Sequence, residues 1–130
     1  MDRQFDTLYA YLALARRPGK TAEVEDRTRL MVRELAAERS GCPWCLAKAQ
    51  HDWRNAGLPV DLLSQLARHE TSSGLTEADR AALALVDAVA CGATDAAATL
   101  ARVRRHFSDR GLAELTACLA DHHLIADHSL

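Results

Sequence analysis

The chain has 130 residues, of which 48% are hydrophobic, and its formal net charge is −2 at pH 7. This length and composition fit a single domain, residues 1–130, with a modest core. A pI of about 6.3 excludes the basic excess expected of a nucleic-acid-binding protein, and the apolar runs are too short to cross a bilayer. We therefore expect no nucleic-acid partner and no membrane insertion. Because the N-terminus lacks a long apolar stretch, we expect a cytoplasmic location.

Apolar residues recur at helical spacing and β-branched residues are few, which predicts an all-α protein of about seven helices without internal repeats. Several segments are apolar on more than one face, which favours either a buried central helix or burial against other subunits. In chain order, helices are expected over residues 2–17, 21–39, 43–56, 59–69, 80–91, 96–107 and 109–130, with a loop over 70–74.

Residues that start or stop helices support these boundaries. Gly41 breaks the second helix. Pro43 suits the first turn of the third helix, because the N–H that a proline lacks is not used there. Thr76 and Asp79 resemble a capping box ahead of the fifth helix, and Ser108 can cap the last one.

The sequence GCPWC, residues 41–45, places two cysteines one turn apart at the predicted start of the third helix. The free N–H groups of a helix N-terminus stabilise an anion, which favours a thiolate at Cys42. Lys48, three residues after Cys45, is a candidate cation on the same face, and the partner thiol can donate a hydrogen bond. Once one sulfur has attacked a disulfide, the other lies close enough to resolve the mixed disulfide.

Two other interpretations of the cysteine pair remain open: half of a metal site, or two inert buried residues. A structural zinc ion needs four ligands, and beyond the two cysteines only His51 is a nearby candidate. No second cysteine pair or histidine pair follows at zinc-finger spacing. The redox dithiol is the favoured interpretation, and neither a metal nor a cofactor is expected.

Other reactive side chains are expected to be structural. Cys91 and Cys118 fall on apolar helix faces, where buried, unreactive thiols are usual. The segment DHHLIADH, residues 121–128, is expected to form an exposed or hydrogen-bonded cluster rather than a metal site.

Most of the sequence resembles the carboxymuconolactone decarboxylase superfamily and, within it, the alkyl hydroperoxidase D (AhpD)-like branch. The resemblance is carried, in this order, by DRTRLMVRELAAERSGCPWC, NAGLPVDLLSQL, LTEADRAALALVDAVA and FSDRGLAELTACLADHHLIADHSL. It implies an all-α fold whose protomers form homo-oligomers, as trimers or hexamers. Members with a cysteine pair are similar to thiol-dependent peroxidases and disulfide reductases. In them Cys45 would be the peroxide-facing thiol and Cys42 the resolving one.

The chain departs from this family at two positions of the family's proton relay. Leu30 stands where members carry a glutamate, twelve residues before the first cysteine, and Ala49 stands where they carry a histidine. Glu38 and His51 are candidate replacements, although His51 falls on a different helical face from the second cysteine. Glu34 lies one turn before Glu38 and can share its face.

These features predict a thiol–disulfide oxidoreductase or peroxidase-like enzyme that acts through Cys42 and Cys45. Its substrate would be a disulfide or a peroxide, and a protein is among the candidate reductants. Which thiol attacks first stays open, because the helix terminus favours Cys42 and the resemblance favours Cys45. Two other classes remain: a non-enzymatic oligomeric scaffold that lost the relay, and a lactone decarboxylase, although the decarboxylase members lack the cysteine pair.

Overall fold

The computed structural model describes residues 23–92 and 96–121, and every regular element in these two ranges is helical. The all-α prediction is therefore confirmed. The helix expected over 2–17 and the histidine-rich residues 122–130 lie outside the described residues. The described elements are α2 (Asp26–Ser40), α3 (Pro43–Asn55), α4 (Val60–Leu66), the short 3₁₀ helix η1 (His69–Thr71), α5 (Glu77–Ala90), α6 (Ala96–Arg104) and α7 (Asp109–Asp121).

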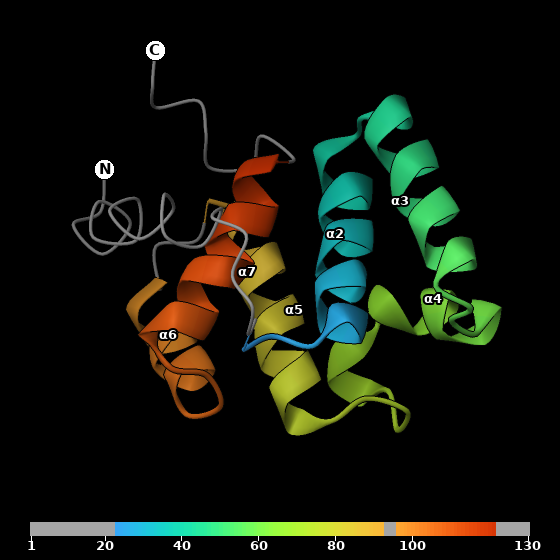
Figure 1. The fold of residues 1–130 in the computed structure, drawn as a ribbon. Coiled ribbons are helices and arrows are strands. Elements are labelled where there is room, and N and C mark those ends of the chain that lie inside the picture. The colour runs from blue at the N-terminus through green and yellow to red at the C-terminus, as the bar shows by residue number, and fades with distance from the viewer. Residues whose placement is uncertain (1–22, 93–95, 122–130) are drawn as a thin grey trace, which may run out of the picture.

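Helix α2 is the central element, with α3 on one side and α5 and α7 on the other (Figure 1). Met31 and Leu35 of α2 are fully buried and belong to the same core cluster as Trp53 of α3 and Leu83 of α5. Burying one such side chain contributes about 1.5–3 kcal/mol. Helix α3 packs mainly on α2 and lies at the edge of the fold (Figure 1). The contact between these two helices is called the α2–α3 seam below.

Helix α2 begins at Asp26, five residues later than the sequence predicted, and residues 23 and 24 just before it are bonded to α7 instead of joining the helix. The buried carboxylate of Glu114 accepts hydrogen bonds from the N–H of Val24 at 2.9 Å and of Glu23 at 3.1 Å. These two N–H groups are thus committed to a contact about 90 residues away in the chain. Such a long-range contact cannot be inferred from local helix signals.

The predicted capping box of α5 is confirmed. The Thr76 hydroxyl accepts from the N–H of Asp79 at 3.0 Å, and the Asp79 carboxylate accepts from the N–H of Thr76 at 3.1 Å. The same buried carboxylate also accepts from Arg27 and Thr28 of α2, so it joins the start of α5 to the start of α2. Ser108 caps α7 as expected, because its hydroxyl accepts from the N–H of Gly111.

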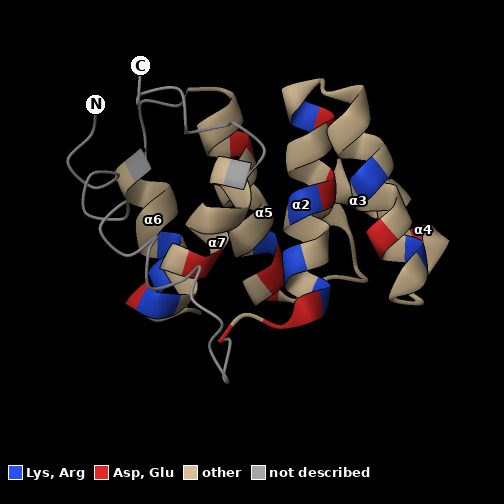
Figure 2. Ribbon diagram, turned by 45° about the horizontal axis from the view of Figure 1, so that its top comes forward, with Lys and Arg blue, Asp and Glu red and all other residues tan. Residues whose placement is uncertain are grey.

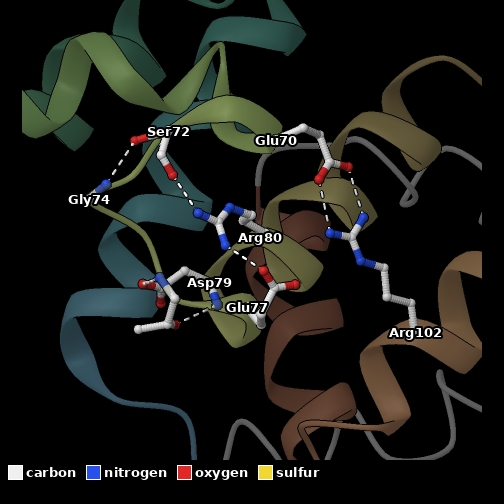
Figure 3. A network of polar contacts seen from close by, with 8 residues as sticks. Glu70, Ser72, Gly74, Glu77, Asp79, Arg80 and Arg102 are labelled. Atoms are coloured by element: carbon white, nitrogen blue, oxygen red, sulfur yellow. Dashed lines mark hydrogen bonds and ion pairs between the residues drawn. The ribbon is translucent and has the colours of Figure 1, made fainter.

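The segment expected as a loop over 70–74 is partly helical, and polar contacts fix it (Figure 3). Arg102 of α6 donates two hydrogen bonds to the carboxylate of Glu70, at 2.8 and 2.9 Å. Arg80 of α5 donates to the carbonyl oxygen of Ser72 and to the carboxylate of Glu77, both at 2.5 Å. Two arginines on different helices therefore hold this connection in place.

Two helices end earlier than predicted. Helix α4 stops at Leu66 rather than at residue 69, and α6 stops at Arg104 rather than at residue 107. After Arg104 the N–H groups of His106 and Phe107 both donate to the carbonyl oxygen of Val103, which tightens the chain into a turn.

None of the described helices combines the length and apolarity needed to span a membrane. Basic and acidic residues are mixed along α2 and α3 (Figure 2), so neither helix presents a stripe of one charge. A mixed pattern of this kind keeps the local electrostatic potential low.

Candidate thiol site

The turn between α2 and α3 depends on Gly41. Its φ of 68° is in the left-handed region that glycine tolerates best, and its N–H donates to the carbonyl oxygen of Glu38 at 3.3 Å. The chain then reverses, with Cys42 as the N-cap of α3 and Pro43 as the first helical residue. The predicted start of this helix is confirmed, and its physical reason is the Gly-Cys-Pro order.

Cys42 caps α3 through its own sulfur. The Sγ atom accepts the N–H of Cys45 at 3.2 Å, in the place where a serine or aspartate oxygen usually caps a helix. Both cysteines are free thiols; Cys42 is half-buried and Cys45 is buried. The backbone of one cysteine is therefore bonded to the sulfur of the other at the mouth of the helix.

This geometry moves the two thiol pKa values in opposite directions. The pKa of Cys42 is lowered, first by the hydrogen bond from the Cys45 side chain and then by the N–H groups of Cys45 and Trp44. The pKa of Cys45 is raised, first by the same hydrogen bond to Cys42, then by burial and by the negative charge that develops on Cys42. Cys42 is thus the thiol that ionises first.

The two thiols have different surroundings. Cys45 packs with Ala37 of α2 and Ala49 of α3 in a small apolar cluster separate from the main core. Trp44, between the cysteines, is 73% exposed, one of two large hydrophobic side chains among the described residues that face solvent. Cys42 is therefore the more accessible of the two thiols, and an exposed indole lies between the cysteines in the chain.

Glu34 is a buried residue of α2 that contacts Gln50 of α3, and it was noticed in the sequence without being selected as a site residue. Its side chain is 3% exposed, Gln50 of α3 hydrogen-bonds to the carboxyl group, and its Oε2 atom has no hydrogen-bond partner. Burial, repulsion from Glu38 and a smaller opposing effect of Gln50 raise its pKa to about 7. The available signal was its place on the apolar stripe of α2, three residues after Met31.

The other three predicted site residues lie at the surface. Lys48 forms an ion pair with Asp52 at 3.2 Å, one turn further along α3 from the thiols. The imidazole of His51 is exposed and hydrogen-bonded to Asn55 at 2.9 Å. Glu38 is exposed in the last turn of α2. The structure thus brings Cys42 and Cys45 together, while Lys48 and His51 have partners of their own on α3.

The comparisons with known proteins bear on the fold. No protein-family model and no curated protein matches the sequence. One similar solved structure is ATU0492 from Agrobacterium tumefaciens, a protein of unknown function described as a candidate antioxidant defence protein AhpD. It has a TM-score of 0.68 and 24% sequence identity, over 92% of this chain and 79% of that one.

The chain has the AhpD-like fold.

Within this AhpD-like fold, both expected relay positions are apolar. Leu30 packs against the main core, and Ala49, 7% exposed, packs beside Cys45. Neither side chain can accept or donate a proton. A buried group that can do so is the Glu34 carboxyl, one turn after Leu30 on α2.

The two remaining cysteines differ in exposure. Cys118 is buried at 2%, as expected, but the prediction for Cys91 is wrong, because it is exposed as the C-cap residue of α5. Helix α5 ends at Ala90, so Cys91 lies just past the packed part of the helix. In the part of the chain that the structure describes, no group of three or more His, Cys, Asp or Glu side chains could hold a metal ion.

Proposed function

We propose that this protein is a thiol–disulfide oxidoreductase in which Cys42 attacks the substrate and Cys45 resolves the mixed disulfide. One observation carries the proposal: the capping geometry lowers the pKa of the more accessible thiol and raises that of the buried one. Two neighbouring groups whose pKa values are pushed apart are suited to different roles in one reaction. The antioxidant role attributed to ATU0492 agrees with this assignment.

The reaction has two exchange steps. The Cys42 thiolate attacks one sulfur of a disulfide RS–SR′, a Cys42–SR bond forms, and R′S⁻ leaves. The Cys45 thiol then loses its proton and its sulfur attacks Cys42 Sγ, which releases RS⁻ and leaves a Cys42–Cys45 disulfide. The substrate gains two electrons and the protein loses two. A dithiol reductant, which we propose is a protein, then breaks the Cys42–Cys45 disulfide by two further exchanges, is itself oxidised to a disulfide, and restores both thiols.

A disulfide is a better substrate for this site than a hydroperoxide. Cleavage of a peroxide O–O bond expels an alkoxide or hydroxide, which needs a proton donor close to the attacked oxygen. A thiolate is a much weaker base and leaves without one. The apolar Leu30 and Ala49 remove the two proton-transfer positions that the resemblance led us to expect, so the proposal is restricted to disulfide exchange.

The exposed Trp44 supports a large partner. Tryptophan is enriched among the side chains that dominate protein–protein binding energy, and this exposed one is two residues after the attacking cysteine. We propose that Trp44 is covered by another protein, either a protein reductant or a second protomer of a homo-oligomer. We also propose that the protein is cytoplasmic. Sedimentation of the reduced and oxidised protein at several concentrations tests the oligomer.

Trapping of the mixed disulfide tests the proposed reaction. In a Cys91→Ser background, which removes an exposed competing thiol, Cys45→Ser should accumulate a mixed disulfide with oxidised glutathione at Cys42. Cys42→Ser should react far more slowly under the same conditions. Mass spectrometry locates the adduct, and alkylation rates against pH give the thiol pKa values.

Other outcomes would favour the other classes. Two ordinary thiol pKa values near 8.5, without trapping, would favour a non-enzymatic scaffold. Lactone decarboxylation that survives replacement of both Cys42 and Cys45 by serine would favour a decarboxylase.

A further inference from the structure

A hollow of about 400 Å³ lies between the chain that follows α4 and one face of α5, and it is called the η1 hollow below. Its volume is in the range of small-molecule pockets. Ala67 and Ala84 give it apolar wall, and Arg68, His69 and Asp87 supply polar groups. No cysteine lines it, so it is separate from the thiol site. Apolar wall with a few polar groups suits a small amphipathic molecule.

Both carboxylates that line the η1 hollow are already paired. The Asp87 carboxylate accepts from His69 Nε2 at 2.7 Å and from Arg39 Nε at 2.8 Å. The Glu70 carboxylate accepts both of its bonds from the guanidinium of Arg102 (Figure 3). Each acid therefore has a guanidinium partner, and neither needs a cation from a bound molecule.

Arg68 is the charged lining residue that has no such partner. Its side chain is exposed, and among the described residues its guanidinium forms no hydrogen bond or ion pair. Its backbone is held, because its N–H donates to the carbonyl oxygen of Gln65 and its own carbonyl oxygen accepts from Thr71, both at 3.1 Å. Arg68 and Thr71 also line a second hollow of about 280 Å³, together with Ser72 and Ser73. An unmatched positive charge thus lies where the η1 hollow meets a hydroxyl-rich one.

His69 contributes a second polar group without a partner. Its side chain is 5% exposed and its Nε2 is held by Asp87, but its buried Nδ1 has no hydrogen-bond partner among the described residues. A buried polar atom in this state costs free energy, and such atoms are often found where a bound molecule completes a site. The η1 hollow therefore combines an unmatched charge with an incompletely bonded imidazole.

We propose that the η1 hollow binds a small organic acid that has one carboxylate and an apolar body, and that Arg68 binds the carboxylate. The planar guanidinium fork matches a carboxylate in two parallel N–H···O bonds. The apolar body would lie against Ala67 and Ala84. A second negative charge on the ligand is disfavoured, because Glu70 and Asp87 line the same hollow. This site needs neither thiol and goes beyond the proposed oxidoreductase.

Titration of the full-length protein with benzoate tests the site, with benzamide as the neutral counterpart and phenyl phosphate as the doubly charged one. Isotope-labelled alanine methyl groups and the His69 ring protons report occupancy by NMR, and their shifts against concentration give Kd. Arg68→Gln removes the charge, and Ala84→Leu fills the hollow. Arg54→Gln is the matched control, because Arg54 is an exposed arginine of α3 that lines neither hollow.

Benzoate should move the Ala84 methyl and His69 ring signals along one saturating curve. Benzamide should bind at least about tenfold more weakly, because hydrogen bonds to charged groups are worth that much in Kd. Arg68→Gln should weaken benzoate binding by a similar factor, whereas Arg54→Gln should leave Kd unchanged. In Ala84→Leu the saturating shift of His69 should disappear. Phenyl phosphate should bind more weakly than benzoate.

Four results would overturn the inference. Benzoate that shifts neither reporter removes the site, and the same Kd in Arg68→Gln and Arg54→Gln removes the arginine from it. Tighter binding of phenyl phosphate means that the ligand is not a monocarboxylate. Unchanged binding in Ala84→Leu places the acid outside the hollow. The alanine methyl signals of the core show that each variant is folded, and Arg68→Gln, at an exposed side chain, still decides the matter if Ala84→Leu does not fold.

Discussion

Replacing Glu34 with glutamine should stabilise the protein at alkaline pH and leave its stability nearly unchanged at acidic pH. In the folded protein the carboxyl has a pKa of about 7, compared with 4.5 for an ordinary glutamate. Well below pH 4.5 the group is protonated in both the folded and the unfolded chain, so it carries no electrostatic penalty. As the pH rises from 4.5 to 7, the unfolded chain loses this proton first, and folding stability falls.

The size of the effect follows from the difference of about 2.5 pKa units. At about 1.4 kcal/mol per unit, the charged carboxylate costs the folded state about 3 kcal/mol above pH 7. Glutamine has nearly the same shape as protonated glutamate and never ionises. Glu34→Gln should therefore match the parent at pH 4.5 and exceed its free energy of unfolding by about 2–3 kcal/mol at pH 8.

Urea unfolding at pH 4.5, 6, 7 and 8, followed by the fluorescence of buried Trp53, measures this difference. Subtracting parent from variant cancels the other groups that titrate in the same range. Glu38→Gln is the matched control, because it removes an exposed charge one turn away and should stabilise by less than about 1 kcal/mol. A difference between Glu34→Gln and the parent that does not change with pH would refute the argument.

Three further substitutions test the fold and the assignment of surface residues. Thr76→Ala removes the cap that pairs with Asp79 and should lower the free energy of unfolding by about 1–2 kcal/mol, measured by chemical denaturation. Leu35→Ala, at a fully buried position of α2, should cost about 2–5 kcal/mol by the same assay. Lys48→Ala breaks an exposed pair with Asp52 and should change stability by less than about 0.5 kcal/mol. It should leave the alkylation rate of the thiols unchanged, and a slower rate would show that this ammonium does act on them.

Helix starts and stops with local causes could be read from the sequence. The capping box at Thr76, the cap at Ser108 and the Gly41–Pro43 reversal each depend on residues within three or four positions of one another. The partners in hydrogen bonds of this range are set by neighbouring residues, so the pattern can be recognised without knowing the rest of the fold. The cysteine pair at the mouth of α3 belongs to the same class, because its geometry is set by one helical turn.

Contacts between distant segments could not be read in this way. The late start of α2 depends on Glu114, about 90 residues away, and the ordered turn after α4 depends on Arg102. Cys91 becomes exposed because α5 ends there, although its position on an apolar face indicated burial.

The sequence alone determined the helical class and the placing of two thiols at a helix N-terminus, because both follow from the periodicity and hydrogen bonding of neighbouring residues. Tertiary structure decided which carboxylate is buried. Glu34 and Glu38 are one turn apart on the same helix, yet the packing of the fold buries the first and leaves the second in water. A pKa depends on what surrounds a group in three dimensions, and only the folded seam between α2 and α3 supplies those surroundings.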